Sequence, residues 1–325
     1  MKKHLSMRFF SFFLVFLFLP FSVVCGENRN ITLFPSAAQQ QLFGKEATLL
    51  DIAYENETIY MLFQSGIYRY TLDNEEPLLL SSFFPIEQEG EFSFSTYEEA
   101  FEQIGEDAKF LFRHLFTYQE RLYGYNPLTG DAVPFDLETG SLLTEEMLHL
   151  AYIPPLQDEE GGTYSLSIQG VIGSKLLLLL TAHYPIEYPK SRLLTIDIST
   201  TEQTFYDVAN IKRAMPYQGE TLLLLTHDEQ ADAYDSMKFE LLDLSTGSLS
   251  PYGELNAWNA QGFTYSPKED AVFYSAENTI YKWRYDTQGE KVGYIQVSTL
   301  GKEGEKAWIT SDLRLFMPPK IIKVF

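Results

Sequence analysis

Cysteine is almost absent from this sequence. Of 325 residues only Cys25 is a cysteine, so no disulfide can form within the chain and no site of several thiolates can hold a metal. The fold must therefore be stabilised by packing alone. Apolar residues make up 45% of the chain and aromatic residues 15%, which is enough for a large core and excludes a disordered chain.

Positive charge is scarce as well. The chain has 24 lysines and arginines against 45 acidic residues, a net charge of −21. Such an excess repels phosphate backbones and anionic lipid, so it excludes nucleic acids and membrane surfaces as partners. The same excess keeps an exposed protein surface soluble.

Motifs for catalysis and for cofactors are missing. The sequence contains no glycine-rich phosphate loop and no Gly-x-Ser-x-Gly elbow. No two of the five histidines stand at the helical spacing of a metal site; they are His4, His114, His149, His183 and His227. We therefore expect no cofactor and no enzyme activity. A carbohydrate-active hydrolase or lyase is the alternative, since so many carboxylates would hide an acid–base pair.

The N-terminus predicts export. A basic start with Lys2 precedes the apolar run Phe9–Val24 and the small residue Gly26, which together make a secretory signal peptide. The run is shorter than the roughly 20 residues that span a bilayer, and Pro20 interrupts it. We expect residues 1–26 to be removed and the protein to lie outside the cytoplasm, either secreted or lipid-anchored to the outer face of the cell membrane.

Two processing routes are open at this signal. A cut after Gly26 leaves Glu27 at the N-terminus. Alternatively, Cys25 occupies the place of the acylated cysteine of a bacterial lipoprotein, although Val24 stands where a smaller residue is usual. A lipid on Cys25 is then the one membrane contact that we expect, because several acyl chains hold a protein at a membrane.

Short turns recur along the rest of the chain. The clearest are Asp136–Gly140 and Asp243–Gly247, both Asp-x-x-Thr-Gly, and weaker copies begin at Asp73, Asp197 and Asp286. Aspartate accepts hydrogen bonds from the backbone of a tight turn, and glycine supplies a positive φ at its exit. An apolar strand precedes each turn, so the pattern predicts antiparallel hairpins.

The spacing of the turns predicts a β-propeller. Their aspartates stand 43 to 63 residues apart, and a unit of roughly 45 residues with four short antiparallel strands is a propeller blade. Leu176–Leu180 and Leu222–Leu225 are too short for helices and predict strands buried on both faces. We expect an all-β propeller of about six four-stranded blades within residues 27–325.

One or two short helices account for the longer intervals. Thr96 and Glu99 form a capping box, which predicts a helix to about Ile104. The segment Thr144–Leu150 predicts a second helix. Both lie between turns that are more than 60 residues apart, and these intervals are longer than a four-stranded unit needs.

Closure of the ring requires strands from both ends. Five blades span about Ala47 to Thr299, and the residues after them supply three more strands. Asn30–Phe34 is an apolar strand with no blade of its own. Propellers remove open sheet edges by letting one terminus complete the sheet of the other, so we expect residues 30–35 to complete the final blade. A shortened gene product with an incomplete blade is the alternative.

The strand pairs resemble a known superfamily. Thr58–Leu62 followed by Gly66–Tyr70, and the segment Phe239–Gly247, are similar to the repeats of TolB-like and quinoprotein-like propellers. More narrowly, residues 1–317 resemble the propeller region that precedes the ligand-binding domain in some bacterial extracellular solute-binding proteins. The narrower resemblance implies a shortened relative of a solute-binding lipoprotein, although this chain stops where the binding domain would begin.

Two groups of residues are candidate ligand sites. An acidic loop can hold calcium through its carboxylate oxygens, with a solvated loop as the alternative; it contains Asp228, Glu229, Asp232 and Asp235. Trp258, Trp283 and Trp308 can form a row on which sugars stack, with filling of the space between blades as the alternative. The function that we expect is an exported binding or scaffold propeller for an extracellular protein, peptide or glycan.

Overall fold

The computed structural model describes a large part of the chain. The described residues are 30–31, 33–34, 49–55, 58–63, 66–71, 78–83, 96–150, 164–182, 191–206, 208, 210–227, 236–256, 260–267, 269–276, 279–285, 290–295, 308–309, 314–317 and 320–323. The predicted signal segment and Cys25 lie outside these residues.

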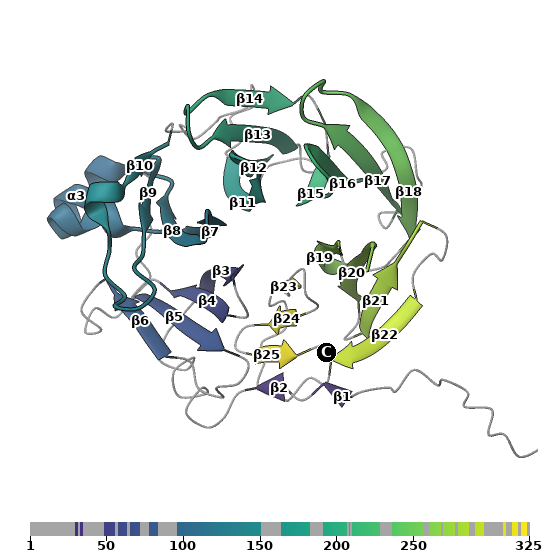
Figure 1. Ribbon diagram of the computed structural model, residues 1–325, viewed down its shortest axis with the longest axis horizontal. Helices are drawn as coiled ribbons and strands as arrows, with labels where there is room; N and C mark the ends of the chain where they lie inside the picture. Colours follow the sequence, from purple (N-terminus) through teal and green to yellow (C-terminus); the bar gives the residue numbers. More distant parts are fainter. Residues whose placement is uncertain are drawn as a thin grey trace, which may run out of the picture.

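Six sheets stand in a ring, each radiating from the centre like a blade (Figure 1). The first blade contains β3 (Leu49–Glu55), β4 (Thr58–Phe63), β5 (Gly66–Thr71) and β6 (Leu78–Ser82). The second contains β7 (His114–Tyr118), β8 (Arg121–Asn126), β9 (Asp131–Pro134) and β10 (Leu148–His149). The third contains β11 (Tyr164–Ile172), β12 (Lys175–Ala182), β13 (Ser191–Asp197) and β14 (Gln203–Tyr206).

The remaining blades complete the circle. The fourth contains β15 (Ile211–Pro216), β16 (Thr221–His227), β17 (Ser236–Asp243) and β18 (Leu249–Asn256). The fifth contains β19 (Gln261–Ser266), β20 (Ala271–Ala276), β21 (Thr279–Trp283) and β22 (Glu290–Ile295), and the sixth contains β23 (Trp308–Ile309), β24 (Arg314–Met317) and β25 (Lys320–Lys323). Strands that follow one another within a blade pair in antiparallel fashion, so the chain is a β-propeller, as the turns predicted.

Two short N-terminal strands join the last blades. β2 (Leu33–Phe34) pairs in antiparallel fashion with β25, with Leu33 opposite Ile322. β1 (Asn30–Ile31) instead pairs in parallel with β22, with Asn30 opposite Tyr294. The count of about six four-stranded blades therefore needs correction: five sheets have four strands, and β1 gives the fifth blade a fifth strand.

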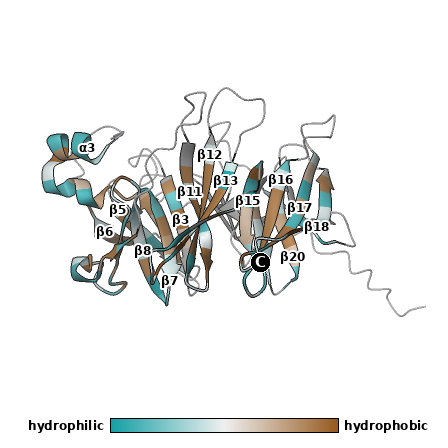
Figure 2. Ribbon diagram, turned by 90° about the horizontal axis from the view of Figure 1, so that it is seen from above, coloured by the Kyte–Doolittle hydropathy of each residue, from teal (hydrophilic) through white to brown (hydrophobic). Residues whose placement is uncertain are grey.

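Leucine strands form the core between blades. Leu176–Leu180 in β12 are at most 3% exposed. Because side chains alternate along a strand, Leu176 and Leu178 face Tyr125 of the second blade, whereas Leu177 faces Leu222 of the fourth. Both faces of the blade are thus buried, and Figure 2 shows the apolar colouring running along the strands.

Aspartate side chains organise three of the turns. The Oδ1 atom of Asp136 accepts hydrogen bonds from the N–H groups of Glu138 at 2.9 Å and Thr139 at 3.1 Å. Asp197 and Asp243 accept from the same two positions of their own turns, at 2.8 to 3.0 Å. Hydrogen bonds to the charged form lower the pKa of each aspartate: chiefly the hydroxyl of Ser174 at Asp197, the hydroxyl of Ser245 at Asp243, and the backbone N–H of Thr139 at Asp136, with the remaining turn bonds adding to the effect.

Backbone conformation and a close contact explain why the first of these turns ends in a glycine. Gly140 has a φ of +74°, a conformation that side chains disfavour. A Cβ atom at this position would lie 1.7 Å from the carbonyl oxygen of Leu80 on the outer side of the first blade. The turn of the second blade therefore packs directly against backbone of the first.

One of the two predicted helices is confirmed. Helix α3 (Tyr97–Ile104) begins after Thr96, whose Oγ1 accepts from the N–H of Glu99 at 3.2 Å. A 3-10 helix, Gly105–Phe110, follows it. Among the described residues no helix has the length and apolar character needed to cross a membrane.

The second predicted helix, Thr144–Leu150, is wrong. Only Thr144–Glu146 form a single 3-10 turn, and β10 follows at once. β10 pairs with β9 through Leu148 opposite Ala132, and Leu150 is buried in the core. The outer edge of β9 offers backbone hydrogen bonds and an apolar face, which outweigh the weak helix preference of so short a segment.

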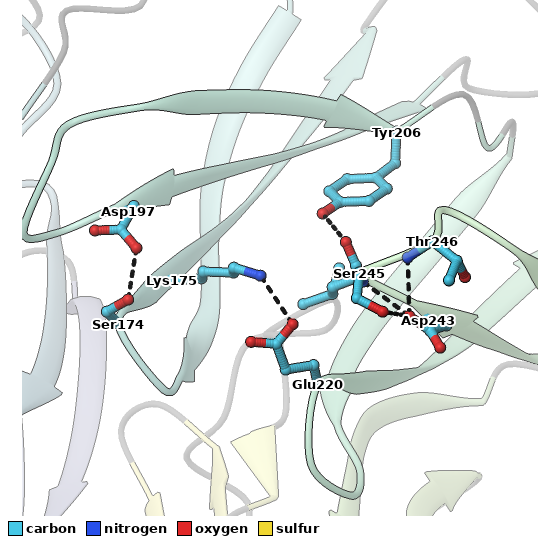
Figure 3. A network of polar contacts seen from close by, with 9 residues as sticks. Ser174, Lys175, Asp197, Tyr206, Glu220, Asp243, Ser245 and Thr246 are labelled. Carbon is cyan, nitrogen blue, oxygen red and sulfur yellow. Dashed lines mark hydrogen bonds and ion pairs between the residues drawn. The ribbon is translucent and has the colours of Figure 1, made fainter.

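Polar contacts join the third blade to the fourth (Figure 3). The hydroxyl of Tyr206, at the end of β14, donates to the carbonyl oxygen of Leu244 at 2.9 Å. Lys175 and Glu220 form an ion pair at 3.2 Å between the two blades. Tyr206 is buried, so its hydrogen bond is sheltered from water, whereas Glu220 is well exposed and its ion pair contributes little.

We predict that replacing Tyr206 with Phe lowers the free energy of unfolding by about 1 kcal/mol, because the buried carbonyl of Leu244 loses its donor. Urea denaturation of the two proteins measures this difference. The matched control is Tyr285→Phe, because the side chain of Tyr285 is 72% exposed; this change should leave stability unaltered. Equal effects of the two substitutions would contradict the interblade role of Tyr206.

We predict that the turn aspartates stabilise the protein less as the pH falls. Their pKa values in the folded state lie below the ordinary value of 3.8. Their stabilisation is therefore complete above that value and is lost as the pH drops through the folded-state pKa values. Melting curves of the wild type and of the triple variant Asp136→Asn, Asp197→Asn, Asp243→Asn should differ most at pH 6, with the wild type more stable, and the difference should narrow progressively as the pH falls below 3.8. A difference that does not depend on pH would refute the electrostatic explanation.

Candidate ligand site at the centre of the ring

The first four inner strands, β3, β7, β11 and β15, are neighbours around the centre of the ring (Figure 1). Three of them carry one extra residue relative to the strand that they pair with. The extra residues are Leu50 in β3, Gln169 in β11 and Lys212 in β15. Such bulges bend a strand and redirect its side chains, and they are frequent beside functional sites.

Asp51 follows the first bulge and joins two blades. Its Oδ1 accepts from the N–H of Ile52 at 2.9 Å, and its Oδ2 accepts from the N–H of Leu115 on β7 at 2.9 Å. The Nδ1 atom of His114 lies 3.6 Å from the same Oδ2. Both side chains are less than one fifth exposed. Through its Oδ2 atom, Asp51 thus holds the first blade to the second.

Gln169, the bulged residue of β11, joins the third blade to the fourth. Its Oε1 accepts from the N–H of Ala214 on β15 at 3.2 Å. Its Nε2 donates to the hydroxyl of Ser167 at 2.9 Å. The amide is therefore fixed in one orientation, with a second Nε2 hydrogen left over.

Arg213 follows the bulge of β15 and lacks a partner. Its Nε atom is buried and has no hydrogen-bond partner, and no carboxylate of the described residues lies within 4.0 Å of its guanidinium. Burial lowers the pKa of Arg213, and the negative charge of Asp51 opposes part of this shift. Asp51 and Arg213 stand on the first and fourth inner strands, which are opposite in a ring of six.

The inner strands thus carry a positive group and polar groups that hydrogen bonds hold in place. A guanidinium presents N–H donors in a planar fork that suits an anion. Gln169 and His114 add polar atoms from two further strands. Within the described part of the chain, no three or more His, Cys, Asp or Glu side chains lie close enough together to hold a metal ion.

The structure describes some of the site residues predicted from the sequence, and others lie outside the described residues. The acidic loop of Asp228, Glu229, Asp232 and Asp235 lies outside the described residues, as do Cys25 and Trp258. Trp283 is 2% exposed and its ring centre lies 4.3 Å from that of Phe239 across the fourth and fifth blades, so it fills space between them. His227 is half-buried, and burial lowers its pKa; His183 lies outside the described residues.

Sequence reasoning did not select the residues of the central site. Asp51, Gln169 and Arg213 stand in no motif, and His114 was considered only as one of five histidines. Asp51, Gln169 and Arg213 stand on or next to the bulge of an inner strand, and His114 stands next to Leu115, whose N–H donates to Asp51. A bulge depends on pairing between strands, which no short motif announces.

Comparison with known proteins adds likenesses of fold. No protein-family model matches the sequence, and no curated protein does. Among solved structures, the Dos1 propeller has a TM-score of 0.45 at 13% identity over 83% of this chain, which spans 64% of that one. An oligogalacturonate lyase from Vibrio parahaemolyticus has a TM-score of 0.43 at 10% identity, covering 91% of this chain and 98% of its own. The placement of this chain among the β-propellers follows from its own ring of sheets.

We predict opposite effects on stability from two substitutions at the centre. Arg213→Met should leave the free energy of unfolding unchanged or raise it by up to about 2 kcal/mol, because an unpaired guanidinium no longer has to be desolvated. Asp51→Ala should lower it by about 2 kcal/mol, because the N–H of Leu115 loses a charged acceptor. Urea denaturation measures both. A large loss of stability in Arg213→Met would mean that Arg213 supports the fold instead of a ligand.

Proposed function

We propose that this chain is an exported, non-enzymatic binding propeller that holds a small ligand at the centre of its ring. The observation that supports the proposal is the buried, unpartnered Nε of Arg213. A buried donor without an acceptor costs about 1 to 3 kcal/mol. A fold that keeps such a group beside ordered polar side chains is prepared for an acceptor that comes from outside.

Export is the second part of the proposal. It is supported by the basic start, the apolar run and the small residue at Gly26. The protein then works outside the cytoplasm, either free or held by a lipid on Cys25. Loss of the signal removes three positive charges and no acid, which leaves the mature chain at −24.

Asp51 has a structural role at this site. Its two carboxylate oxygens each accept from a backbone N–H group, and Oδ2 also lies near His114. The bond from Leu115 positions β7 next to β3.

A carbohydrate-active hydrolase or lyase is the second candidate. The observation that favours it is a histidine 3.6 Å from a carboxylate, His114 and Asp51, whose charge also acts on Arg213. Such groups can act as base, acid and electrostatic stabiliser. Turnover of a bound compound separates this candidate from the binding proposal.

The test is a thermal-shift screen of small molecules and glycans on the mature protein purified from its own host. We expect at least one compound to raise the melting temperature of the wild type and of Arg192→Met, but not of Arg213→Met. Arg192 is an exposed arginine of β13 and provides the matched control. Incubation with the wild-type protein should leave each stabilising compound chemically unchanged, as in a sample without protein.

Three outcomes would overturn the proposal. Stabilisation that is the same in Arg213→Met as in the wild type would remove the ligand from the centre of the ring. Conversion of a stabilising compound into product would favour the hydrolase or lyase. An intact Met1 in mass spectrometry of the native protein would refute export, whereas Glu27 or an acylated Cys25 would support it.

A further inference from the structure

We infer that the ligand carries a carboxylate group and that Arg213 binds it side-on, through its Nε–H and the neighbouring terminal N–H. This inference rests on the proposed function, since it names the chemical class of the ligand at the same site. It follows from the geometry of the guanidinium, from the occupied state of Asp51 and from the charge of the whole chain.

The free donor of Arg213 defines one edge of its guanidinium. The buried Nε has no acceptor in the structure. Nε–H and the terminal N–H on the same edge point in parallel, at a spacing that matches the two oxygens of a carboxylate. A neutral carbonyl offers one oxygen to this edge and leaves the positive charge without compensation.

Among the described residues no carboxylate pairs with this edge. Asp51 is the acid whose charge acts on Arg213, yet it lies beyond 4.0 Å from the guanidinium. Its oxygens are held by the N–H groups of Ile52 and Leu115 on the opposite side of the ring. Moving Asp51 to Arg213 would break both bonds, so an external carboxylate is the better acceptor.

The size and charge of the ligand are limited by its surroundings. The chain carries a net charge of −21, which repels molecules with many negative charges at low salt. A ligand with one carboxylate loses little from this repulsion and gains a charge-assisted contact with the buried Nε–H of Arg213. The leftover Nε2 hydrogen of Gln169 gives a second donor for a hydroxyl or carbonyl oxygen of the same ligand.

The experiment observes the Nε–H signals of arginine by NMR in the mature protein, labelled with nitrogen-15 at arginine. Acetate and acetamide are the probes, because they share size and shape and differ in charge. The signal missing from Arg213→Lys identifies Arg213. We expect acetate to shift this signal saturably, and acetamide or sodium chloride at equal concentration to leave it in place. In Arg213→Lys, which keeps the charge without the fork, acetate should bind about tenfold more weakly in a calorimetric titration.

Each other result has a defined meaning. Equal shifts with acetate and acetamide, or equal shifts at Arg213 and the exposed Arg192, would refute a carboxylate site. Unchanged acetate affinity in Arg213→Lys would refute the side-on contact. If a compound from the thermal-shift screen needs Arg213 while acetate neither binds nor competes with it, the proposed function stands and the carboxylate inference fails. If the screen finds only compounds that ignore Arg213, the proposed function itself fails.

Discussion

Burial of both faces of the second, third and fourth blades is the constraint on which this structure depends. A sheet such as that of β11–β14 has leucines pointing to both sides, so it is stable only with a blade on each flank. A row of blades always leaves two apolar faces open, whereas a ring leaves none. Closure therefore follows from the leucine strands, and the Tyr206 hydrogen bond and the close approach at Gly140 act between blades that this packing has already brought together.

The same constraint determines where a ligand can bind. The faces of the blades are occupied by neighbouring blades, which leaves the inner strand edges, the outer strands and the turns. Inner strands from different blades line the same side of the ring, so residues far apart in sequence, such as Asp51, Gln169 and Arg213, stand on strands that are neighbours in a row around the centre. Three of these strands are bulged, and bulges are frequent beside functional sites.

Features encoded by a few adjacent residues could be predicted from the sequence. The Asp-x-x-Thr-Gly turns, the capping box at Thr96 and the leucine strands have the predicted form. The helix at Thr144–Leu150 was wrong because an open strand edge captured part of it. The central site could not be predicted, because it depends on the register between strands and on which inner strands face each other, and neither is written in a local pattern.

The pairing of β1 and β2 also concerns the order in which the protein can be completed. The partner of β2 is β25, among the last residues of the chain, and the partner of β1 is β22. While the chain is being synthesised or exported, β1 and β2 are present long before β22 and β25 are available to pair with them. A chain of intermediate length therefore has an open ring with unpaired strand edges. The pairing of β2 with β25 joins strands that are far apart in sequence, so it forms last. Ring closure thus couples the folding of the two distant segments, since the sheet of β23–β25 gains its fourth strand only when β2 reaches β25.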